Sequence, residues 1–445
     1  MDSNTILLLM AGLFLALSFL GLPIAFSLLG STLVASAFAG VGFPSIAGEM
    51  FNGVNSVPLL AVPFFLLVAE LMDSSGIAAR IIYFVQTLVG HIRSGLAQVN
   101  AVFSIFFAGI SGSSMSDVAA ASRVLLPAMK REGYEPASSA ALIAAASTIA
   151  NLIPPSIMAV IYGATGGISI SALFVGGVLP GLMVGVGLMV YSYFFVHAGE
   201  SAPRAPLKVM AKAGVNSALP LMVPVIIMGG ILSGIFTPTE AGMVSVVYII
   251  VVVIPLMARR HFPKLFGDFI RGGVLFSLPM LAVAGASVFA WLFTYLGGAT
   301  AISDFMFGVA GRTPLAIMFT LVVVLVVVGQ FIDAIPAIVM FMPIIMALTE
   351  LGDINPVHMG VVVIVTLALG LITPPYGLSL LLASSFANVP FLAAVKKAVP
   401  IYGVFGIIIT LLIVFPDAVL WLPRQIVPQA VGCLPAPGDG GFICS

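Results

Sequence analysis

Long apolar stretches are the feature that most constrains this chain. Of its 445 residues, 61% are hydrophobic and only 7% are charged, with 16 Lys and Arg against 16 Asp and Glu. A soluble domain carries roughly 25% charged residues, so this chain has too little polar surface to cover a water-soluble globule of its size. The composition therefore predicts a membrane protein that crosses the bilayer many times.

The same composition excludes several classes of function. A net charge of zero without any basic arm argues against a nucleic-acid partner. The two cysteines, Cys433 and Cys444, lie in the polar tail, and no His/Cys cluster could hold a transition metal. Cys433 and Cys444 could pair if they are exported, or they could remain free thiols.

Eight stretches are long and apolar enough to be unbroken spanning helices, which need about 20 residues. They are Ile6–Leu20, Leu22–Ala39, Ser56–Met72, Ile170–Val196, Val215–Ile235, Ala241–Met257, Val274–Leu296 and Phe391–Val414. Because only helices or closed barrels satisfy the backbone inside lipid, these stretches predict an all-α polytopic fold.

Two further apolar stretches are interrupted in the middle. Polar residues Ser111–Ser114 divide 93–130, and Gly329–Asp333 divides 312–350. Each arm has about 14 to 16 residues, or ~21 to 24 Å of helix, which is shorter than the ~30 Å hydrocarbon core. The sequence therefore predicts two re-entrant helical hairpins.

Two other stretches, 137–164 and 357–386, contain a Pro-Pro pair, Pro154–Pro155 and Pro374–Pro375. Proline lacks a backbone donor and clashes with the preceding turn, so each helix must break there and leave free carbonyl groups. Such carbonyls persist at membrane depth only where protein, water or an ion satisfies them.

These features occur twice, in the same order. Pro154–Pro155 returns as Pro374–Pro375, and Pro180 as Pro400, about 220 residues later. The duplication predicts four parts: a first repeat (1–199), an amphipathic cytoplasmic linker (200–214), a second repeat (215–422) and a polar tail (423–445). With five spans and one hairpin per repeat, and Ile77–Gly90 on the membrane surface, the odd number of crossings inverts the second repeat.

Charge supports this topology, because it segregates nearly all cations to one face. The other face holds only Arg312 and Arg424, and Arg123 lies within a hairpin arm. By the positive-inside rule the basic face is cytoplasmic, which predicts that both termini are periplasmic. The basic face collects Arg80, Arg93, Lys130, Arg131, Arg204, Lys208, Lys212, Arg259, Arg260, Lys264, Arg271, Lys396 and Lys397.

Inverted repeats with broken helices at the midplane are the architecture of secondary transporters, in which unwound carbonyls coordinate cations. Two symmetry-related Na⁺ sites follow as a hypothesis, although a proton could replace the ion. The first site would use Ser111, Gly112, Ser113, Ser114 and Asn151, and the second Gly329, Asp333, Gly370 and Thr373. Candidates for substrate contact are Ser114, Asp117, Arg123, Pro155 and Tyr376.

Several of these residues also have a purely structural interpretation. Asp117 and Asp333 could be functional carboxylates at membrane depth or helix N-caps. Asn151 could be a ligand or a cap, and Arg123 could bind a substrate carboxylate or extend to the cytoplasmic interface. Two other groups look structural: Glu70 and Asp73 are expected to be solvated at the end of a span, and Thr237–Glu240 to form a capping box.

Five motifs resemble the large membrane subunit, DctM type, of tripartite ATP-independent periplasmic (TRAP) transporters. Two departures weaken the assignment of side chains to ion sites: Ala150–Asn151 stands where the family usually has Gly-Pro, and Thr366 where it commonly has asparagine. The motifs are Gly109–Asp117, Leu126–Lys130 followed by Gly133–Tyr134, Ile153–Ser156 followed by Ile161–Gly163, Thr237–Ala241 and Thr373–Gly377.

The resemblance implies an elevator-type, Na⁺-driven importer of organic acids such as sialic acid, a C4-dicarboxylate or a 2-oxo acid, in the bacterial inner membrane. It implies two partners: a small four-helix membrane subunit (DctQ/SiaQ type) and a periplasmic substrate-binding protein (DctP/SiaP type). One alternative is a Na⁺/dicarboxylate symporter that needs no binding protein. A passive channel and an intramembrane aspartyl protease are more distant alternatives, and the protease would lack its Gly-x-Gly-Asp context.

Overall fold

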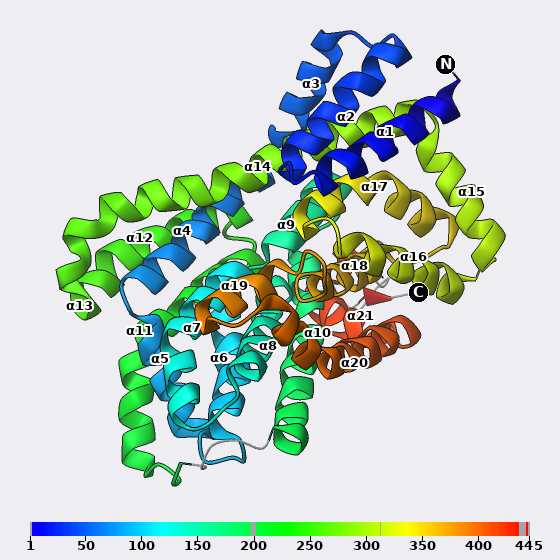
Figure 1. Cartoon of the computed structure of the whole chain (residues 1–445). Helices are drawn as coiled ribbons and strands as arrows, with labels where there is room; N and C mark the ends of the chain where they lie inside the picture. The colour runs from blue at the N-terminus through cyan, green and yellow to red at the C-terminus, as the bar shows by residue number, and fades with distance from the viewer. Residues whose placement is uncertain (1, 197–201, 312, 436–441, 444–445) are drawn as a thin grey trace.

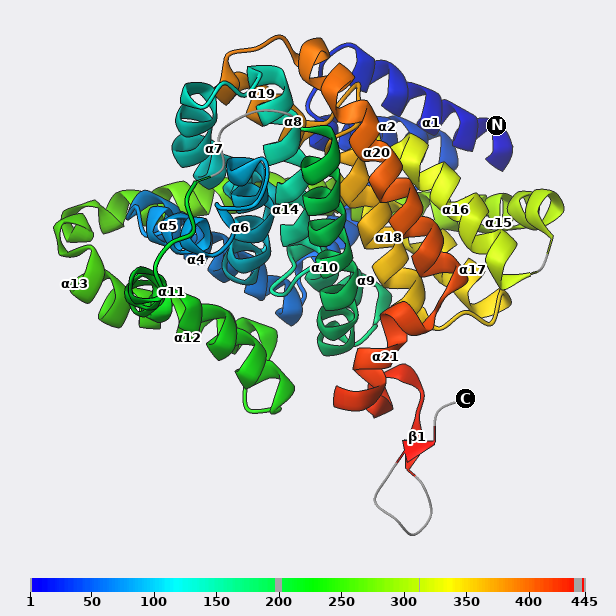
Figure 2. The ribbon, with the colours of Figure 1, turned by 90° about the horizontal axis from the view of Figure 1, so that it is seen from below.

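The chain folds almost entirely into helices. The computed structural model describes residues 2–196, 202–311, 313–435 and 442–443. Within these residues the β structure is a single antiparallel pair of two-residue strands, β1 (Leu434–Pro435) and β2 (Phe442–Ile443). The predicted all-α fold is confirmed, and Figures 1 and 2 show the helices from two directions at right angles.

Seven helical segments of the described residues are long and apolar enough to cross a membrane. Six of them match predicted spans. The two predicted spans at the N-terminus form the helices α1 (Ser3–Phe19) and α2 (Ile24–Ala39), which with 17 and 16 residues are shorter than any of these seven segments. The seven segments are Val57–Ser74, Ile170–Phe195, Leu207–Leu232, Pro238–Met257, Arg259–Tyr295, Ala334–Leu351 and Phe391–Val414.

Both predicted hairpins are present. The first is α6 (Gly95–Ser111) and α7 (Ser114–Arg131), and the second is α16 (Pro314–Gly329) and α17 (Ala334–Leu351). The predicted arm length of 14 to 16 residues is too short, because the arms have 17, 18, 16 and 18 residues. At 1.5 Å per residue they measure about 24 to 27 Å, still less than the ~30 Å hydrocarbon core.

Both Pro-Pro pairs interrupt a helix, and both are cis peptide bonds. Before the first pair α8 (Pro136–Ser147) ends in the 3-10 turn η2 (Thr148–Asn151), and α9 (Ile157–Gly166) begins after it. Around the second pair α18 (Pro356–Gly370) gives way to α19 (Leu378–Ala387). The predicted broken helices are therefore confirmed.

Helices of each repeat pack against helices of the other repeat, and the pattern is the same in both directions. Hairpin arm α7 packs against α19 of the other repeat, and arm α17 packs against α9. Likewise α8 packs against α20 (Phe391–Val414), and α18 against α10 (Ile170–Phe195). A two-fold relation between the halves gives this pattern, and it brings both hairpins and both broken helices into one body (Figure 2).

The remaining helices form a frame beside this body. The 31-residue α14 (Leu265–Tyr295) packs against α2, α3, α4 and α17 and runs between the two ends of the frame in Figure 1. The other frame elements are α3 (Phe43–Val54), η1 (Val57–Leu60), α4 (Ala61–Ser74), α5 (Ala78–Val89), α11 (Leu207–Leu232), α12 (Pro238–Tyr248), the π-helical turn η3 (Ile249–Val253), α13 (Ile254–Met257), η4 (Arg259–Lys264) and α15 (Gly298–Ala310).

The linker and the tail differ in part from the prediction. Residues 207–214 of the expected linker are the start of the spanning helix α11, while 197–201 and Arg312 lie outside the described residues. The tail begins in helix, since α21 (Asp417–Ile426) and η5 (Pro428–Val431) cover much of 423–431. Cys433 is disulfide-bonded, and Cys444 lies outside the described residues.

Candidate functional site

The tip of the first hairpin meets the first Pro-Pro loop through the backbone. The amide of Ile157 donates to the carbonyl of Gly112 at 3.3 Å. Gly112 has a φ of 60°, and a Cβ on it would lie 2.0 Å from the carbonyl oxygen of Pro155. Only glycine permits both this left-handed conformation and this approach, so Gly112 determines how closely the tip and the loop can pack.

Buried polar side chains surround this first crossing. The hydroxyl of Ser111 donates to Oδ1 of Asp117 at 2.5 Å, and the amide nitrogen of Asn151 donates to the hydroxyl of Ser114. The hydroxyl of Ser156 donates to the carbonyl of Asn151 at 2.5 Å. All five residues are at most 4% exposed. We call these five residues the first-crossing cage.

One acceptor of the cage is left open. Oδ2 of Asp117 is buried and has no hydrogen-bond partner in the part of the chain that the structure describes. A buried carboxylate oxygen without a partner is costly, and such groups are rare in folded proteins. The cage therefore contains a buried carboxylate oxygen that is available to a cation or a proton.

The second crossing repeats the backbone arrangement. The amide of Tyr376 donates to the carbonyl of Gln330 at 3.0 Å. A Cβ on Gly370 would lie 2.7 Å from the carbonyl oxygen of Gly329, so these two glycines are in direct contact. The hydroxyl of Thr373 donates to the carbonyl of Gly370 at 3.1 Å. Here the contacts between hairpin and loop are made by the backbone.

Comparison with known proteins agrees with this architecture. The family model described as "Tripartite ATP-independent periplasmic transporter, DctM component" matches residues 11–418. The chain belongs to this family. It is therefore the large permease component of a TRAP transporter, a membrane protein that performs secondary transport and is not an enzyme, and the protease alternative is discarded.

Relatives of this DctM-family permease carry matching names. It is 34% identical to the sialic acid TRAP transporter large permease SiaM of Vibrio cholerae, over 92% of this chain and 96% of that one. It is 35% identical to the C4-dicarboxylate TRAP transporter large permease DctM of Pseudomonas aeruginosa, over 89% and 93%. It is 34% identical to the 2,3-diketo-L-gulonate TRAP transporter large permease YiaN of Escherichia coli, over 90% and 95%.

A solved structure shares the fold. The YdaH transporter of Alcanivorax borkumensis superposes with a TM-score of 0.56 over 84% of this chain and 88% of its own, at 14% sequence identity.

The structure tests the helix-capping roles that the sequence predicted for three sites. Asp333 is the N-cap of α17 and accepts from the amide of Ala334 at 2.9 Å, as predicted. The N-cap interpretation of Asp117 is wrong, because Ser113 occupies the N-cap position of α7 and Asp117 follows in its first turn. The capping box at Thr237–Glu240 is confirmed.

Sequence reasoning missed Ser156. This residue is the N-cap of α9, and its hydroxyl accepts from the amide of Ala159 at 3.1 Å in addition to bonding Asn151. A serine directly after Pro-Pro and before an apolar helix is a standard N-cap signal. The same oxygen therefore joins the restart of the helix to the cage.

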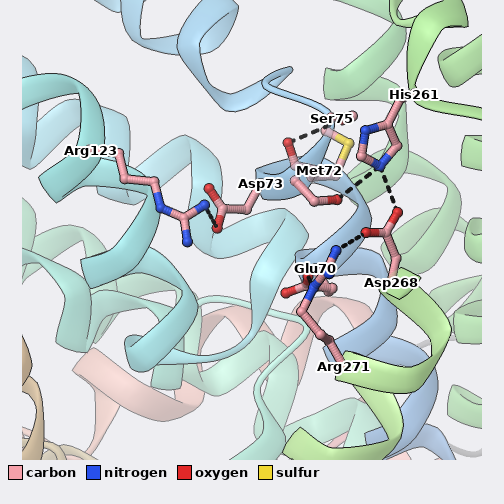
Figure 3. Close-up of polar contacts among 9 residues, drawn as sticks. Glu70, Met72, Asp73, Ser75, Arg123, His261, Asp268 and Arg271 are labelled. Atoms are coloured by element: carbon pink, nitrogen blue, oxygen red, sulfur yellow. Dashed lines mark hydrogen bonds and ion pairs between the residues drawn. The ribbon is translucent and has the colours of Figure 1, made fainter. Parts of the chain in front are cut away.

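Acidic residues at the end of α4 are ion-paired, so their predicted solvation is wrong. Asp73 bonds Arg123 at 2.9 Å, and Glu70 bonds Arg271 at 2.6 Å; the two carboxylates are 12% and 14% exposed. Arg271 also pairs with the buried Asp268 (Figure 3). The side chain of Arg123 is half exposed, and its pairing with Asp73 connects hairpin arm α7 to the frame helix α4.

Proposed function

We propose that this permease couples the import of an organic acid to Na⁺. The observation that carries the proposal is the first-crossing cage, in which the buried Asp117 presents an oxygen with no partner among the described residues. Carboxylate, hydroxyl, amide and carbonyl oxygens are the ligands that hard cations prefer. The proposed first cation site consists of the ligands expected from the sequence, Ser111, Gly112, Ser113, Ser114 and Asn151, and adds Asp117, expected as a substrate contact, because of its open oxygen.

The second cation site would lie at the equivalent crossing, around Gly329, Asp333, Gly370 and Thr373. Thr373 and Asp333 provide side-chain oxygens there, and the ends of α16 and α18 provide carbonyl groups. The substrate carboxylate would bind between the crossings, with Ser114, Pro155 and Tyr376 as candidate contacts. The N-termini of α7, α9, α17 and α19 would favour its negative charge.

Movement of the hairpin body against the frame would give alternating access by an elevator mechanism. The reciprocal packing of α7 with α19 and of α17 with α9 supports this proposal, because it makes the two crossings one unit. The Arg123–Asp73 pair is a surface contact between that unit and the frame.

The orientation proposed for the membrane has the basic face in the cytoplasm and both termini in the periplasm. Two contacts join segments that carry these cations. Arg80 donates to the carbonyl of Met257, two residues before Arg259, at 2.7 Å, and Lys397 pairs at 2.6 Å with Glu135, which follows Lys130 and Arg131 in the chain. In the bacterial inner membrane the positive-inside rule favours this orientation.

The proposed partners are a small four-helix subunit of the DctQ/SiaQ type and a periplasmic binding protein of the DctP/SiaP type. Three relatives are named for sialic acid, a C4-dicarboxylate and 2,3-diketo-L-gulonate, all of which are organic acids. The substrate of this chain is proposed to be a member of the same chemical class.

The test is uptake into liposomes that contain the permease and its small subunit, with the binding protein outside. Panels of radiolabelled organic acids would be offered with an inward gradient of Na⁺ or of K⁺. We expect accumulation only with Na⁺ and the binding protein. Equal uptake with K⁺ would overturn the coupling, and Na⁺-driven uptake without the binding protein would favour the direct symporter.

A further inference from the structure

A cavity of about 370 Å³ lies between hairpin arm α7, helix α8 and the end of α19, away from both crossings. Its polar lining consists of Ser122, Arg123, Lys130, Ser139 and Asn388. Arg123 and Lys130 are two helical turns apart, so both cations line the same stretch of α7. We call this space the basic vestibule.

The chemistry of the basic vestibule suits an anion. The hydroxyl of Ser122 is 2% exposed and has no hydrogen-bond partner among the described residues. Two carboxylates near the lining are already engaged, Asp73 with Arg123 and Glu135, next to the lining residue Pro136, with Lys397. A carboxylate entering the vestibule would meet two cations and a hydroxyl donor, and charge-assisted hydrogen bonds of this kind are strong.

A second cavity, beside the matching arm α17 of the other hairpin, lacks this chemistry. It has a volume of about 520 Å³ and is lined by arm α17, helix α9 and the frame helices α3 and α14. Asp117 and Pro127 of α7 return as Asp333 and Pro343 at and within α17, 216 residues later, so Arg123 and Lys130 correspond to Val339 and Met346. Both of these apolar residues line the second cavity, and Glu49 contributes a negative charge to it. The positive charge is therefore specific to one side of a duplicated backbone.

We propose that the basic vestibule is a second anion site, separate from the site between the crossings, that binds a carboxylate of the transported organic acid as it enters or leaves, and that this carboxylate takes Arg123 from Asp73. The identity of the anion rests on the proposed function. The pair joins Asp73 to a half-exposed arginine, and ion pairs with an exposed partner are weak, so an anion that engages Arg123, Lys130 and Ser122 together can displace Asp73. Occupancy of the vestibule then releases α7 from the frame helix α4.

Charge-selective labelling tests the vestibule without transport. The purified permease with its small subunit would carry Ala387→Cys, a lining residue, in a background of Cys433→Ser and Cys444→Ser. Two thiosulfonate reagents, one anionic (sulfonatoethyl) and one cationic (trimethylammonioethyl), would then be compared. We expect the ratio of the anionic to the cationic labelling rate to exceed that of free cysteine at least tenfold, because a positive local potential speeds one reagent and slows the other, and a potential of about 1 kT already gives this ratio.

Anion occupancy is tested with succinate and with N-acetylneuraminate, each used separately as a probe. At least one of them should slow the labelling of the Ala387→Cys variant threefold or more. The double variant Arg123→Gln with Lys130→Gln should lose both the rate ratio and the protection. Asp73→Asn should lower the probe concentration needed for half protection, because Arg123 is then no longer paired.

The matched control is Arg80→Gln. Arg80 is an exposed arginine bonded to the carbonyl of Met257, and it does not line the vestibule, so this change should leave ratio and protection intact. Phe386→Cys, at the neighbouring lining position, is a second reporter if Ala387→Cys misfolds on gel filtration. A rate ratio equal to that of free cysteine, no protection by either probe, or protection unchanged in the double variant would overturn the proposal.

These outcomes are independent of ion coupling. If the labelling results hold while Na⁺-driven uptake fails, the vestibule stands and the proposed function falls. If uptake succeeds while the labelling ratio is that of free cysteine, the proposed function stands and the vestibule is not an anion site.

Discussion

The two crossings share a backbone but differ in side chains. In both, a cis Pro-Pro loop bonds the tip of a hairpin through one backbone hydrogen bond, and a glycine permits close approach. Around the first crossing, side chains of serine, asparagine and aspartate form a buried network. Around the second, Asp333 is a half-buried helix cap and the close contact joins Gly329 with Gly370.

This difference shows which features of a duplicated site must be the same in both repeats for the repeats to pack. The backbone must break and approach at the same points for the two halves to pack reciprocally, so the glycines and diprolines recur. Side chains that do not determine the packing are free to diverge. We therefore expect the first crossing to dominate ion binding, and the predictions below compare matched positions of the two crossings.

The largest effect is expected for Gly112→Ala. The left-handed conformation costs alanine ~1 to 2 kcal/mol, and overlap with the carbonyl of Pro155 adds ~1 to 3 kcal/mol. Gly329→Ala is the matched change, since its Cβ would lie 3.4 Å from Gly370, an ordinary contact. Thermal midpoints on gel filtration should fall strongly only for Gly112→Ala, and equal midpoints would refute the argument.

Next in size is the effect of Asp117→Asn on ion-coupled uptake. The change keeps the volume but removes the charge and replaces one of the two carboxylate oxygens with an NH2 donor, so the bond from Ser111 no longer goes to a charged acceptor. Hydrogen bonds to charged groups contribute about 1.5 to 3 kcal/mol, which corresponds to a loss of roughly 10- to 100-fold. This loss would be measured as the rate of Na⁺-dependent uptake in liposomes that contain the reconstituted transporter.

Asp333→Asn is the matched variant at the second crossing. Asparagine caps helices as well as aspartate does, so the thermal midpoint should not change and uptake should fall less than for Asp117→Asn. A greater loss of uptake for Asp333→Asn than for Asp117→Asn would contradict the predicted ranking of the two crossings.

A smaller effect is expected for Ser156, the N-cap of α9, whose counterpart at the N-cap of α19 is Gly377. Ser156→Ala removes the cap of α9 and the donor to Asn151, and should lower the free energy of unfolding by about 1 to 2 kcal/mol. Ser156→Gly, which copies the second crossing, loses the same bond to Asn151 but little capping stability. Similar thermal midpoints for the two variants would show that capping contributes nothing here.

A loss of stability smaller than that of Ser156→Ala is expected for Arg123→Val, which copies Val339 of the other hairpin. The pair with Asp73 involves a half-exposed arginine, so its loss should cost at most about 1 kcal/mol. High KCl should reduce the difference in thermal midpoint from the parent, because salt screens exposed charges. A larger destabilisation that is insensitive to KCl would mean that Arg123 stabilises α7 by packing.

Much of this architecture is determined by the sequence itself. The apolar stretches, Gly112 and Asp333 at the hairpin breaks, the two diprolines and the Thr237–Glu240 cap are local signals, because hydropathy, φ preference and missing amide donors act within a few residues. Their repetition also predicts the duplication.

Tertiary structure decided the rest. Only packing shows that Asp117 bonds Ser111 instead of capping α7, that Ser156 connects the helix restart with the cage, and that α7 lies against α19. Arg123 meets Asp73, 50 residues away in the chain. Such contacts depend on how separate helices pack in space, and no pattern within a single segment encodes the neighbour that packing will provide.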